Sequence, residues 1–589
     1  MVARRLVLTA DEHTWPQENK EPVLFLGEWC KRYNRKAVWQ KLDAEVAPYH
    51  WDDRQKLYND YQYLEDLYEK LLLDLSNKLN NIHSVNYSLR YWRTLIGPWL
   101  NIFIQIFFDR WFMLKQTIER EKIIKCNIIS RDPMSVVPND IKHFSNMYVD
   151  DDWNEAVYGQ LLDLNWSDVV NIQKINKPSV DIKIKNNSSL SAKNAFKSHI
   201  EKFWVPILNK LFSKDDDYFI ISSSLSLKTI LKLQINMGQF PKLWQRLSAP
   251  VIKPDIKQRQ WQLDHKFNDG SFEEVVCKLI PLHIPTAYLE GYKDLEKAAS
   301  QSGWPKKPKG IFTSYSYNSD DVFKKWVAEK TETGTMFAIG QHGGHFGMTP
   351  FLFYEGHQIN IADKWLSWGW SDEMRPKIIP VGNLKGFEKN VKYDPKGKAL
   401  MVEKCLPRYS RHLFAVPISG QWLDYLDDQQ KFVKKLPLEI RKQVLLRLYK
   451  NDYGWNQRDR WEDKIPDVHI DSGNQSILEL IKKCRLCIST YNATSYLESL
   501  SWNVPTIIFW NLKHWELKEE AKYYFKLLKS VGIFHETAES AAQQINNVWD
   551  DVAFWWESKE VQNVRQKFCK QYSQENSKLV EHLKEILTN

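Results

Sequence analysis

A glycine-rich turn that carries two histidines stands in the middle of the chain, directly after an apolar run. The turn reads Gly340-Gln-His-Gly-Gly-His-Phe-Gly347, and residues 335–339 before it have the pattern of a short strand. Glycine lacks the Cβ atom that keeps a ligand away from the backbone, and it permits the positive φ angles of a turn that cradles an anion. The turn can therefore bind a phosphate. It is not a Walker A loop, because no Gly-Lys-Ser/Thr follows it.

His342 gives this turn a reactive side chain. An imidazole with a pKa near ~6.5 can donate a hydrogen bond to a phosphate oxygen and carry a positive charge that matches a departing nucleotide. The alternative is a tight turn whose histidine satisfies a backbone carbonyl. Open parallel sheets place ligands at the carboxyl ends of their strands, so we favour the functional interpretation. The candidates are His342 as a catalytic residue, with Gln341, Gly343 and Gly344 as donor-binding residues.

A second cluster, rich in hydroxyl groups, stands between an expected strand over 484–489 and an expected helix over 493–502. The unpaired N–H groups of a first helical turn attract anions, and Thr494 and Ser495 can add their hydroxyls. Glu498 follows Thr494 by four residues, on the same helical face, where it can accept hydrogen bonds from a ribose diol. An ordinary helix cap with a solvated glutamate is the alternative. The candidate donor-binding residues are Ser489, Thr490, Asn492, Thr494, Ser495 and Glu498.

Arginines and carboxylates supply two further groups of candidates. Arg447 and Arg458 flank a charged loop, and their guanidinium groups match phosphate and carboxylate, although a surface loop of Asp–Arg pairs is equally consistent. Group transfer to a hydroxyl also needs a carboxylate, as a base or as a nucleophile. Glu12 follows an expected strand over 6–9 and is our candidate for this catalytic role. The competing acidic residues are Asp11, Asp320, Asp321, Glu355 and Asp363. Helix capping is the favoured role of Asp320 and Asp321.

Strands that alternate with helices must position these residues. Near the N-terminus two short strands, over 6–9 and 23–26, precede two long helical stretches, over 52–79 and 89–118. Further strands are expected over 309–314, 335–339, 359–362, 412–417, 444–449, 484–489 and 505–510. Alternation of this kind in both halves predicts an α/β protein with two parallel-sheet, Rossmann-like domains.

A polar, lysine-rich stretch divides the chain. We expect four segments: a Rossmann-like domain with helical insertions over 1–385, a linker over 386–404, a second Rossmann-like domain over 405–560 and a C-terminal helix over 561–589. Residues 121–300 carry no residue-level prediction, and 175–194 have the composition of a surface loop.

Composition narrows the functional classes. Hydrophobic residues make up 43% and charged residues 26% of the 589 residues, which excludes global disorder. The net charge of +9 is spread along the chain, so nucleic acid is not an expected partner. The expected partners are phosphorylated substrates or an anionic membrane face. The seven cysteines lack regular spacing and fit a reducing compartment. No secretory signal or transmembrane span is evident, so we expect a cytoplasmic protein, peripheral at the membrane face.

Long, tryptophan-rich phrases run through nearly the whole chain. They include Leu8-Thr-Ala-Asp-Glu12-His-Thr-Trp15-Pro16, Phe25-Leu-Gly-Glu-Trp-Cys30, Leu89-Arg-Tyr-Trp-Arg-Thr-Leu-Ile-Gly-Pro-Trp99, Gln341-His-Gly-Gly344, Trp368-Gly-Trp370, Tyr453-Gly-Trp455 and Ser489-Thr-Tyr-Asn-Ala-Thr494. Together they resemble a family of transferases associated with bacterial O-antigen and surface-polysaccharide biosynthesis. More distantly, the arrangement is similar to two-Rossmann (GT-B) glycosyltransferases that use CMP-activated Kdo and other nonulosonic acids.

The resemblance implies a glycosyltransferase with the acceptor on the N-terminal domain and the nucleotide sugar on the C-terminal one. It implies that Thr490, Thr494, Ser495 and Glu498 hold the nucleotide. His342 then faces the phosphate and leaving group across the cleft. The donor would be a CMP-linked ulosonic acid and the acceptor a lipid-linked glycan at the inner membrane, with no cofactor and no metal. The His-Pro and Ser-Ser pairs of some CMP-sialic acid transferases are not cleanly present, so the donor stays open.

Two alternatives remain at this point. One keeps the GT-B fold and changes the donor to a UDP-, GDP- or dTDP-hexose. The other is a non-catalytic scaffold that binds glycan or nucleotide in a polysaccharide assembly complex.

Overall fold

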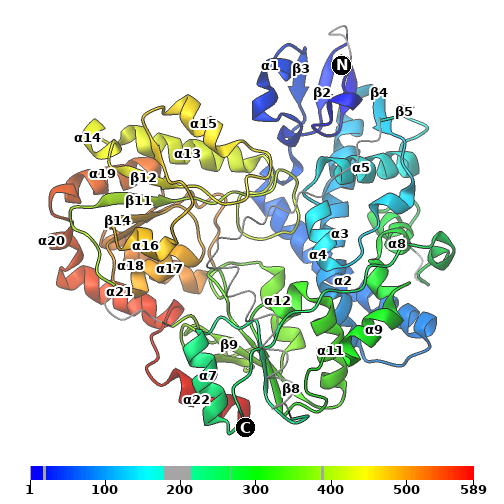
Figure 1. The fold of residues 1–589 in the computed structure, drawn as a ribbon. Coiled ribbons are helices and arrows are strands. Elements are labelled where there is room, and N and C mark those ends of the chain that lie inside the picture. Colours follow the sequence, from blue (N-terminus) through cyan, green and yellow to red (C-terminus); the bar gives the residue numbers. More distant parts are fainter. Residues whose placement is uncertain (1, 17–20, 178–213, 265–266, 387–390, 589) are drawn as a thin grey trace.

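Three parallel β-sheets form the frame of the described chain (Figure 1). The computed structural model describes residues 2–16, 21–177, 214–264, 267–386 and 391–588. We call the three parts the N-terminal lobe (2–177), the middle lobe (214–386) and the C-terminal lobe (391–558). All strand pairs within the three sheets are parallel.

The N-terminal sheet has the order β3-β2-β1-β4-β5. Its strands are β1 (Ala3–Val7), β2 (Val23–Phe25), β3 (Ala44–Val46), β4 (Lys122–Ile129) and β5 (Asn171–Ile175). Every side chain of β2 is buried, as a parallel strand covered on both faces requires. The shorter helices of this lobe are α1 (Lys36–Trp39), α4 (Ile141–Met147) and α5 (Asp151–Asn165).

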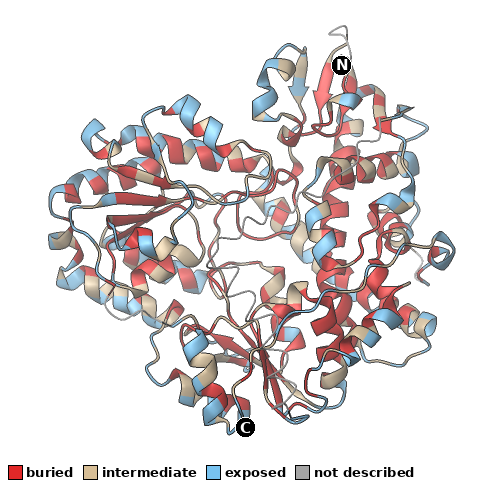
Figure 2. Ribbon diagram, in the orientation of Figure 1, coloured by how far each residue is buried: buried red, intermediate tan, exposed pale blue. Residues whose placement is uncertain are grey.

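Two long helices, α2 (Arg54–His83) and α3 (Leu89–Arg120), connect the N-terminal lobe with the middle lobe and confirm the two expected helical stretches. Asp53 begins α2 by accepting hydrogen bonds from the backbone N–H groups of the first turn. Helix α3 is buried along most of its length, because α2, α5 and α11 (Asp321–Glu332) all pack against it (Figure 2). Its largely apolar sequence, which Asn101, Gln105, Asp109 and Arg110 interrupt, follows from this position.

The middle sheet has the order β10-β9-β8-β7-β6. Its strands are β6 (Phe219–Ile221), β7 (Gly310–Thr313), β8 (Met336–Gly340), β9 (Lys364–Ser367) and β10 (Ile378–Pro380). The other helices of this lobe are α7 (Leu227–Asn236), α8 (Phe272–His283), α9 (Tyr292–Ser300), α10 (Ser316–Ser319) and α12 (Phe353–Ile361). Asp320 caps α11 by accepting from the N–H of Phe323 at 3.0 Å, the capping role that its sequence context favours.

The C-terminal sheet has the order β13-β12-β11-β14-β15-β16. Its strands are β11 (Lys398–Val402), β12 (Val444–Arg447), β13 (His469–Ile470), β14 (Cys484–Ser489), β15 (Thr506–Phe509) and β16 (Phe534–His535). Its helices are α13 (Gln421–Lys435), α14 (Leu438–Arg441), α15 (Gln457–Lys464), α16 (Ile477–Ile481), α17 (Thr494–Ser501), α18 (Glu519–Ser530), α19 (Ala538–Val548) and α20 (Val552–Trp556).

The end of the chain returns to the middle lobe. Helix α21 (Lys559–Tyr572) packs on α17 and α18, and α22 (Leu579–Thr588) packs on α7. Between them, the N–H of Gln574 donates to the carbonyl of Trp368 at 2.7 Å, and the carbonyl of Gln574 accepts from Asn383 at 2.8 Å. The last 30 residues therefore tie the middle and C-terminal lobes together.

The structure confirms the α/β class with parallel sheets that face one another and corrects the segment boundaries. Residues 1–385 hold two sheets instead of one, because the helical stretch α2–α3 separates two sets of strands. The expected linker 386–404 contains β11, a central strand of the C-terminal sheet, and its residues 387–390 lie outside the described chain. The segment 561–589 forms two helices.

Two expected strands are wrong. Residues 359–362 belong mostly to helix α12, and the strand follows at β9. Residues 412–417 form no ladder; only one isolated bridge joins Phe414 to Leu352. These residues are apolar because they are buried between lobes. In sequence, an apolar run that is buried in this way cannot be distinguished from a strand. The expected surface loop 175–194 lies almost wholly outside the described residues.

A membrane-crossing helix is not found in the part of the chain that the structure describes; even α3 is not apolar enough over a sufficient length.

Candidate functional site

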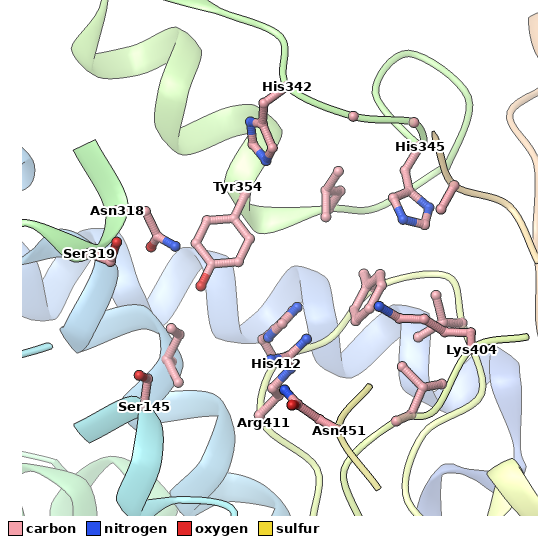
Figure 3. Close-up of a pocket in the computed structure, with 18 of the residues that line it drawn as sticks. Ser145, Asn318, Ser319, His342, His345, Tyr354, Lys404, Arg411, His412 and Asn451 are labelled. Carbon is pink, nitrogen blue, oxygen red and sulfur yellow. The ribbon is translucent and has the colours of Figure 1, made fainter. Parts of the chain in front are cut away.

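A cavity of 960 Å³ lies where the three lobes meet, and we call it the cleft cavity (Figure 3). The turn 340–347 after β8 and the start of α17 form part of its wall. Residues 404–416, which follow β11 and which we call the crossing segment, form another part. Helix α4 and Tyr148 contribute the wall from the N-terminal lobe.

The histidine turn and the start of α17 touch each other directly. The N–H of Gly344 donates to Thr494 Oγ1 at 3.2 Å. A Cβ atom on Gly344 would lie 2.5 Å from the carbonyl carbon and oxygen of Ala493, so only glycine fits here. The sequence suggested that this glycine allows a ligand to approach the backbone closely. In the structure it instead allows close approach of the C-terminal lobe. Two segments that lie 150 residues apart thus meet on one cavity.

His342 points into the cleft cavity from the turn (Figure 3). Its ring contacts Tyr315 at 4.9 Å and Phe346 at 5.2 Å between centroids, and its Nδ1 has no hydrogen-bond partner among the described residues. Burial, followed by the charge of Lys385, lowers the pKa of His342 to about 4. The imidazole is therefore neutral near pH 7, which corrects the expectation of a positively charged side chain.

Two further histidines line the cleft cavity and were not singled out from the sequence as candidates. His345 follows His342 in the turn, and His412 lies in the crossing segment. His412 stacks on Phe414 with centroids 4.6 Å apart, and the Nδ1 atoms of both histidines lack a partner in the described chain. Burial lowers the pKa of His345 to about 3 and that of His412 well below its usual value. All three imidazoles can accept a proton.

Lys404 and Arg411 enter the cleft cavity from the crossing segment (Figure 3). The Nζ of Lys404 lies 3.9 Å from the centroid of the Tyr449 ring. Burial and the nearby charge of Arg411 lower the pKa of Lys404 to about 8. Sequence analysis missed both residues, because single cations in an irregular segment have no spacing signal.

The crossing segment is fixed to the N-terminal lobe by buried hydrogen bonds. Arg110 Nη2 donates to the carbonyl of Ser410 at 2.8 Å, and Arg408 Nη2 donates to Asp151 at 2.7 Å. The N–H of Leu413 donates to the side chain of Gln105. Lys404 and Arg411 therefore project from a backbone that is held on both sides.

A second cavity of 830 Å³ adjoins the first, and we call it the C-lobe cavity. It opens at the carboxyl ends of β11, β12 and β13, where parallel sheets usually bind ligands. Lys450, Asp452, Tyr491 and Thr494 line both cavities. A ligand that contacts Thr494 can therefore extend from one cavity into the other.

Several predicted donor-binding residues line the C-lobe cavity, namely Arg447, Arg458, Thr494, Ser495 and Glu498. Glu498 pairs with Lys385 at 2.7 Å, and Arg447 pairs with Asp471. Arg458 is exposed and pairs with Glu462 at 3.2 Å on α15, so the Asp–Arg loop interpretation holds in a modified form. Arg447, which is held more firmly at this cavity than Arg458, thus already has a carboxylate partner.

A sequence model of the LIC12162 family transferases matches residues 4–587, almost the full chain. The chain belongs to this family. It is therefore a transferase, and the prediction that the chain is a transferase is confirmed. No curated protein matches the sequence significantly.

Solved structures that are distantly similar to this LIC12162 family transferase include MurG, TagF and WaaG. MurG of Acinetobacter baumannii shows 8% identity and a TM-score of 0.32, covering 63% of this chain and 99% of MurG. The wall teichoic acid polymerase TagF shows 11% identity and a TM-score of 0.31, covering 68% and 98%. WaaG, a glycosyltransferase involved in lipopolysaccharide biosynthesis, shows 11% and 0.28, covering 63% and 99%. These similarities are too distant to bear on the activity.

Four predicted donor-binding residues of the LIC12162 transferase act inside the fold and line neither cavity. They are Gln341, Ser489, Thr490 and Asn492. Gln341 accepts hydrogen bonds from the N–H of Trp368 and from Trp370 Nε1, both at 3.0 Å, and so shapes the turn. Thr490 donates to the carbonyl of Val402 at 2.9 Å. Burial of these side chains, which sequence cannot show, corrects their expected role to a positioning one.

Glu12 lies away from both cavities of the transferase. It sits in a short 3-10 turn, Glu12–Thr14, and both carboxylate oxygens accept hydrogen bonds from Arg35, at 2.5 and 2.7 Å. The strand before it ends at Val7, so the turn points the carboxylate to the surface of the N-terminal lobe. The catalytic role expected for Glu12 is therefore corrected.

The competing acidic residue Glu355 also has a structural role. It is buried, and its Oε2 accepts from the N–H of Gly347 at 2.7 Å, while Arg375 and Lys518 pair with its Oε1 at 3.2 and 3.3 Å. It holds the end of the histidine turn in place.

Glu403 is a buried carboxyl group at the wall of the C-lobe cavity that sequence analysis missed. Trp461 Nε1 donates to its Oε2 at 3.1 Å, and its Oε1 has no partner within the described part of the chain. Burial raises the pKa of Glu403 to about 8, so the group is protonated at neutral pH.

Three or more metal-binding side chains do not gather at any point in the described ranges of the transferase.

Proposed function

We propose that this transferase is a glycosyltransferase that moves a sugar from a nucleotide donor onto a lipid-linked O-antigen or capsule glycan. We propose a CMP-activated ulosonic acid, of the Kdo or nonulosonic type, as the donor. The contact between Gly344 and Thr494 supports the proposal most strongly, because it brings the histidine turn and the start of α17 to one cavity. The CMP-linked donor and the glycan acceptor follow from the resemblance of the tryptophan-rich phrases.

In this proposal the donor nucleotide spans the two adjoining cavities. The first-turn N–H groups of α17, with the hydroxyls of Thr494 and Ser495, bind its phosphate. Glu498, one helical turn further along, accepts hydrogen bonds from the ribose diol, and Lys385 holds its carboxylate in place. The base then lies in the C-lobe cavity, beside Arg447 and Arg458.

His342 is the proposed catalytic residue. Its neutral imidazole accepts the proton of the acceptor hydroxyl. The hydroxyl oxygen forms the new bond to the anomeric carbon, and the bond from that carbon to the phosphate oxygen breaks. CMP leaves with the electron pair, and the α17 amides stabilise the additional negative charge on its phosphate.

Thermal-shift titration of the full chain with CMP, UDP, GDP and dTDP tests the donor site. A nucleotide that binds only the folded state raises its stability by about 2.7 kcal/mol at a hundredfold excess over Kd, so we expect CMP to raise the Tm. The Glu498→Gln variant should lose most of this increase. Glu539→Gln is the matched control, because Glu539 is also a helical carboxylate paired with a lysine, Lys431 at 2.5 Å, but lines neither cavity.

The results separate the candidate functions. A Tm increase with UDP, GDP or dTDP but not CMP would favour a hexose donor on the same fold. No increase with any of the four would contradict nucleotide-sugar transfer. A CMP increase with no release of CMP from CMP-linked ulosonic acids, in the presence of glycan acceptor, would favour a binding scaffold.

A further inference from the structure

We propose that Lys404 and Arg411 form a second anion site in the cleft cavity, separate from the site of the donor phosphate. This proposal rests on the proposed function. The ligand of the second site is an anionic group of a substrate, and this group is distinct from the phosphate that the start of α17 binds. Two sources have this chemistry: a carboxylate on the donor sugar, as in a ulosonic acid, or a phosphate on a lipid-linked acceptor.

Arg411 has no carboxylate partner among the residues that the structure describes. Its Nε is buried and has no hydrogen-bond partner in the described chain. Burial lowers the pKa of Arg411, but the phenols of Tyr148, Tyr453 and Tyr354, with a hydrogen bond to Tyr148, raise it overall, and no carboxylate is among the main groups that act on it. A buried guanidinium that lacks a carboxylate partner is costly unless an anion reaches it, and its planar fork matches a carboxylate or phosphate.

Lys404 adds a second cation to the same wall. No carboxylate pairs with it in the ranges that the structure describes, and the charge of Arg411 acts on it directly. Two cations that disfavour each other in this way gain from a shared anion. His412 lies beside Arg411 with an unpartnered Nδ1 and can donate or accept a further hydrogen bond.

The lining of the cleft cavity holds more cations than carboxylates. Asp452 is the sole carboxylate among the described residues that line the cleft cavity, against Lys404, Arg411 and Lys450. Its two oxygens already accept from the N–H groups of Asn456 and Gln457, at 2.8 and 2.7 Å. The cations are therefore available to a ligand.

The two anion sites come from different elements. Thr494 begins α17 in the C-terminal lobe and contacts the histidine turn, whereas Lys404 and Arg411 project from the crossing segment. Figure 3 shows His342 and His345 on one side of the cavity and Arg411 and His412 on the other. Because Arg110 and Gln105 hold the backbone on both sides of Arg411, the second site is formed before a ligand binds.

Binding measurements on the full chain test the proposal with three probes: CMP, CMP-N-acetylneuraminic acid and geranyl diphosphate. The variants are Arg411→Gln and Lys404→Met, with Arg411→Lys as the charge-preserving variant. Arg441→Gln is the control, because Arg441 pairs with Asp467 at 3.1 Å and lines neither cavity. If Arg411→Gln lowers the Tm so far that it does not fold, Lys404→Met decides.

We expect CMP affinity to stay within about twofold of wild type in all variants. A carboxylate source predicts at least a tenfold loss of affinity for CMP-N-acetylneuraminic acid, and an acceptor source predicts the same loss for geranyl diphosphate. Arg411→Lys should recover part of either loss.

Two results would overturn the second anion site. One is an unchanged affinity for both anionic probes. The other is a loss of affinity for free CMP that equals the loss for CMP-N-acetylneuraminic acid. That result would assign Lys404 and Arg411 to the leaving phosphate. Failure of wild type to bind CMP or the CMP-sugar contradicts the proposed function instead, and geranyl diphosphate alone then decides whether the anion site exists.

Discussion

Burial, more than residue type, sets the chemistry of the side chains around the cleft cavity. His342, His345 and His412 are all neutral near pH 7, since burial lowers the pKa of each. A neutral imidazole can take a proton from a hydroxyl but cannot neutralise a phosphate. The positive charge in this cavity comes instead from Lys404, Arg411 and Lys450.

The pH dependence of activity tests the state of His342. Because the neutral form is active and the pKa is lowered to about 4, kcat/KM should stay flat through the ordinary ~6.5 of histidine and fall only towards pH 4. The measurement is the rate of CMP release from a CMP-linked donor against pH, with His342→Ala as the inactive reference. An acidic limb centred near pH 6.5 would show that this imidazole is not the base, or that it is not buried during catalysis.

Glu403 links stability to pH in a predictable direction. Its pKa is about 8 in the folded chain against an ordinary ~4.3, so between these values the folded state binds a proton that the unfolded state has lost. This contribution is present at low pH and is lost as the pH rises from about 4.3 to about 8. We expect Glu403→Gln to become progressively more stable than wild type from pH 5 to pH 8.5, as measured by Tm. A Tm difference that does not change with pH would contradict a buried, protonated Glu403.

Spacing along the sequence identified candidate residues that the structure brings to one cavity, and their roles stay predictions. His342, Gly343, Gly344 and Thr494 were singled out by a glycine-rich turn and a helix start, and the structure places all four at the cleft cavity. Lys404 and Arg411 were missed because their role depends on the absence of partners. Glu12 was misassigned because the geometry of a single turn decides where its carboxylate points.

At the scale of elements, the contact between the histidine turn and the start of α17 positions the site. Gly344→Ala places a methyl group against the backbone of Ala493, which cannot move without displacing α17. We expect a loss of roughly 1–3 kcal/mol in stability, as for other overpacked positions, together with weaker CMP binding. Chemical denaturation and the thermal-shift titration measure these two effects.

Gly356→Ala is the matched control for that substitution. Gly356 lies inside α12 in the same lobe, and an added Cβ there would meet no atom within 4 Å. Alanine favours a helix interior by up to about 1 kcal/mol over glycine, so this variant should keep or gain stability. If both variants behave alike, the contact between the turn and α17 does not constrain the site.

Element prediction worked where periodicity and burial agree. The strand Cys484–Ser489 has the predicted bounds, and α2 and α3 follow from their apolar spacing. The strand prediction for residues 412–417 failed because an apolar segment buried between lobes looks like a strand in sequence. Its backbone instead bonds to the side chain of Gln105 and forms a single bridge to Leu352, both in other lobes. Long-range packing of this kind leaves no local signal.

At the scale of the whole molecule, the sites depend on how three lobes are held together. The sequence predicted two Rossmann-like domains, and the middle and C-terminal sheets that flank the cleft cavity match that arrangement. The separate N-terminal sheet was not predicted, because its short strands are set apart by long helices. The returning helix α22 was expected only as a C-terminal helix, without its place on the middle lobe.

Helix α22 should contribute to the stability of the whole chain. Leu583 is fully buried, and Lys364 of the middle lobe donates to the carbonyl of Ile586 at 2.7 Å. Leu583→Ala should cost about 2–5 kcal/mol and lower the Tm. The adjacent, exposed Lys584→Ala should change stability by less than about 0.5 kcal/mol. Equal effects would mean that α22 does not hold the lobes together.

A crystal structure of the full chain with CMP bound tests most directly whether the histidine turn and the start of α17 form one donor site. The phosphate should lie within about 3 Å of the hydroxyl of Thr494 or Ser495 and of the first N–H groups of α17, with the base in the C-lobe cavity. His342 should lie across the cleft cavity from that phosphate. A phosphate bound elsewhere, with the start of α17 unoccupied, would contradict the claim that these two segments form one donor site.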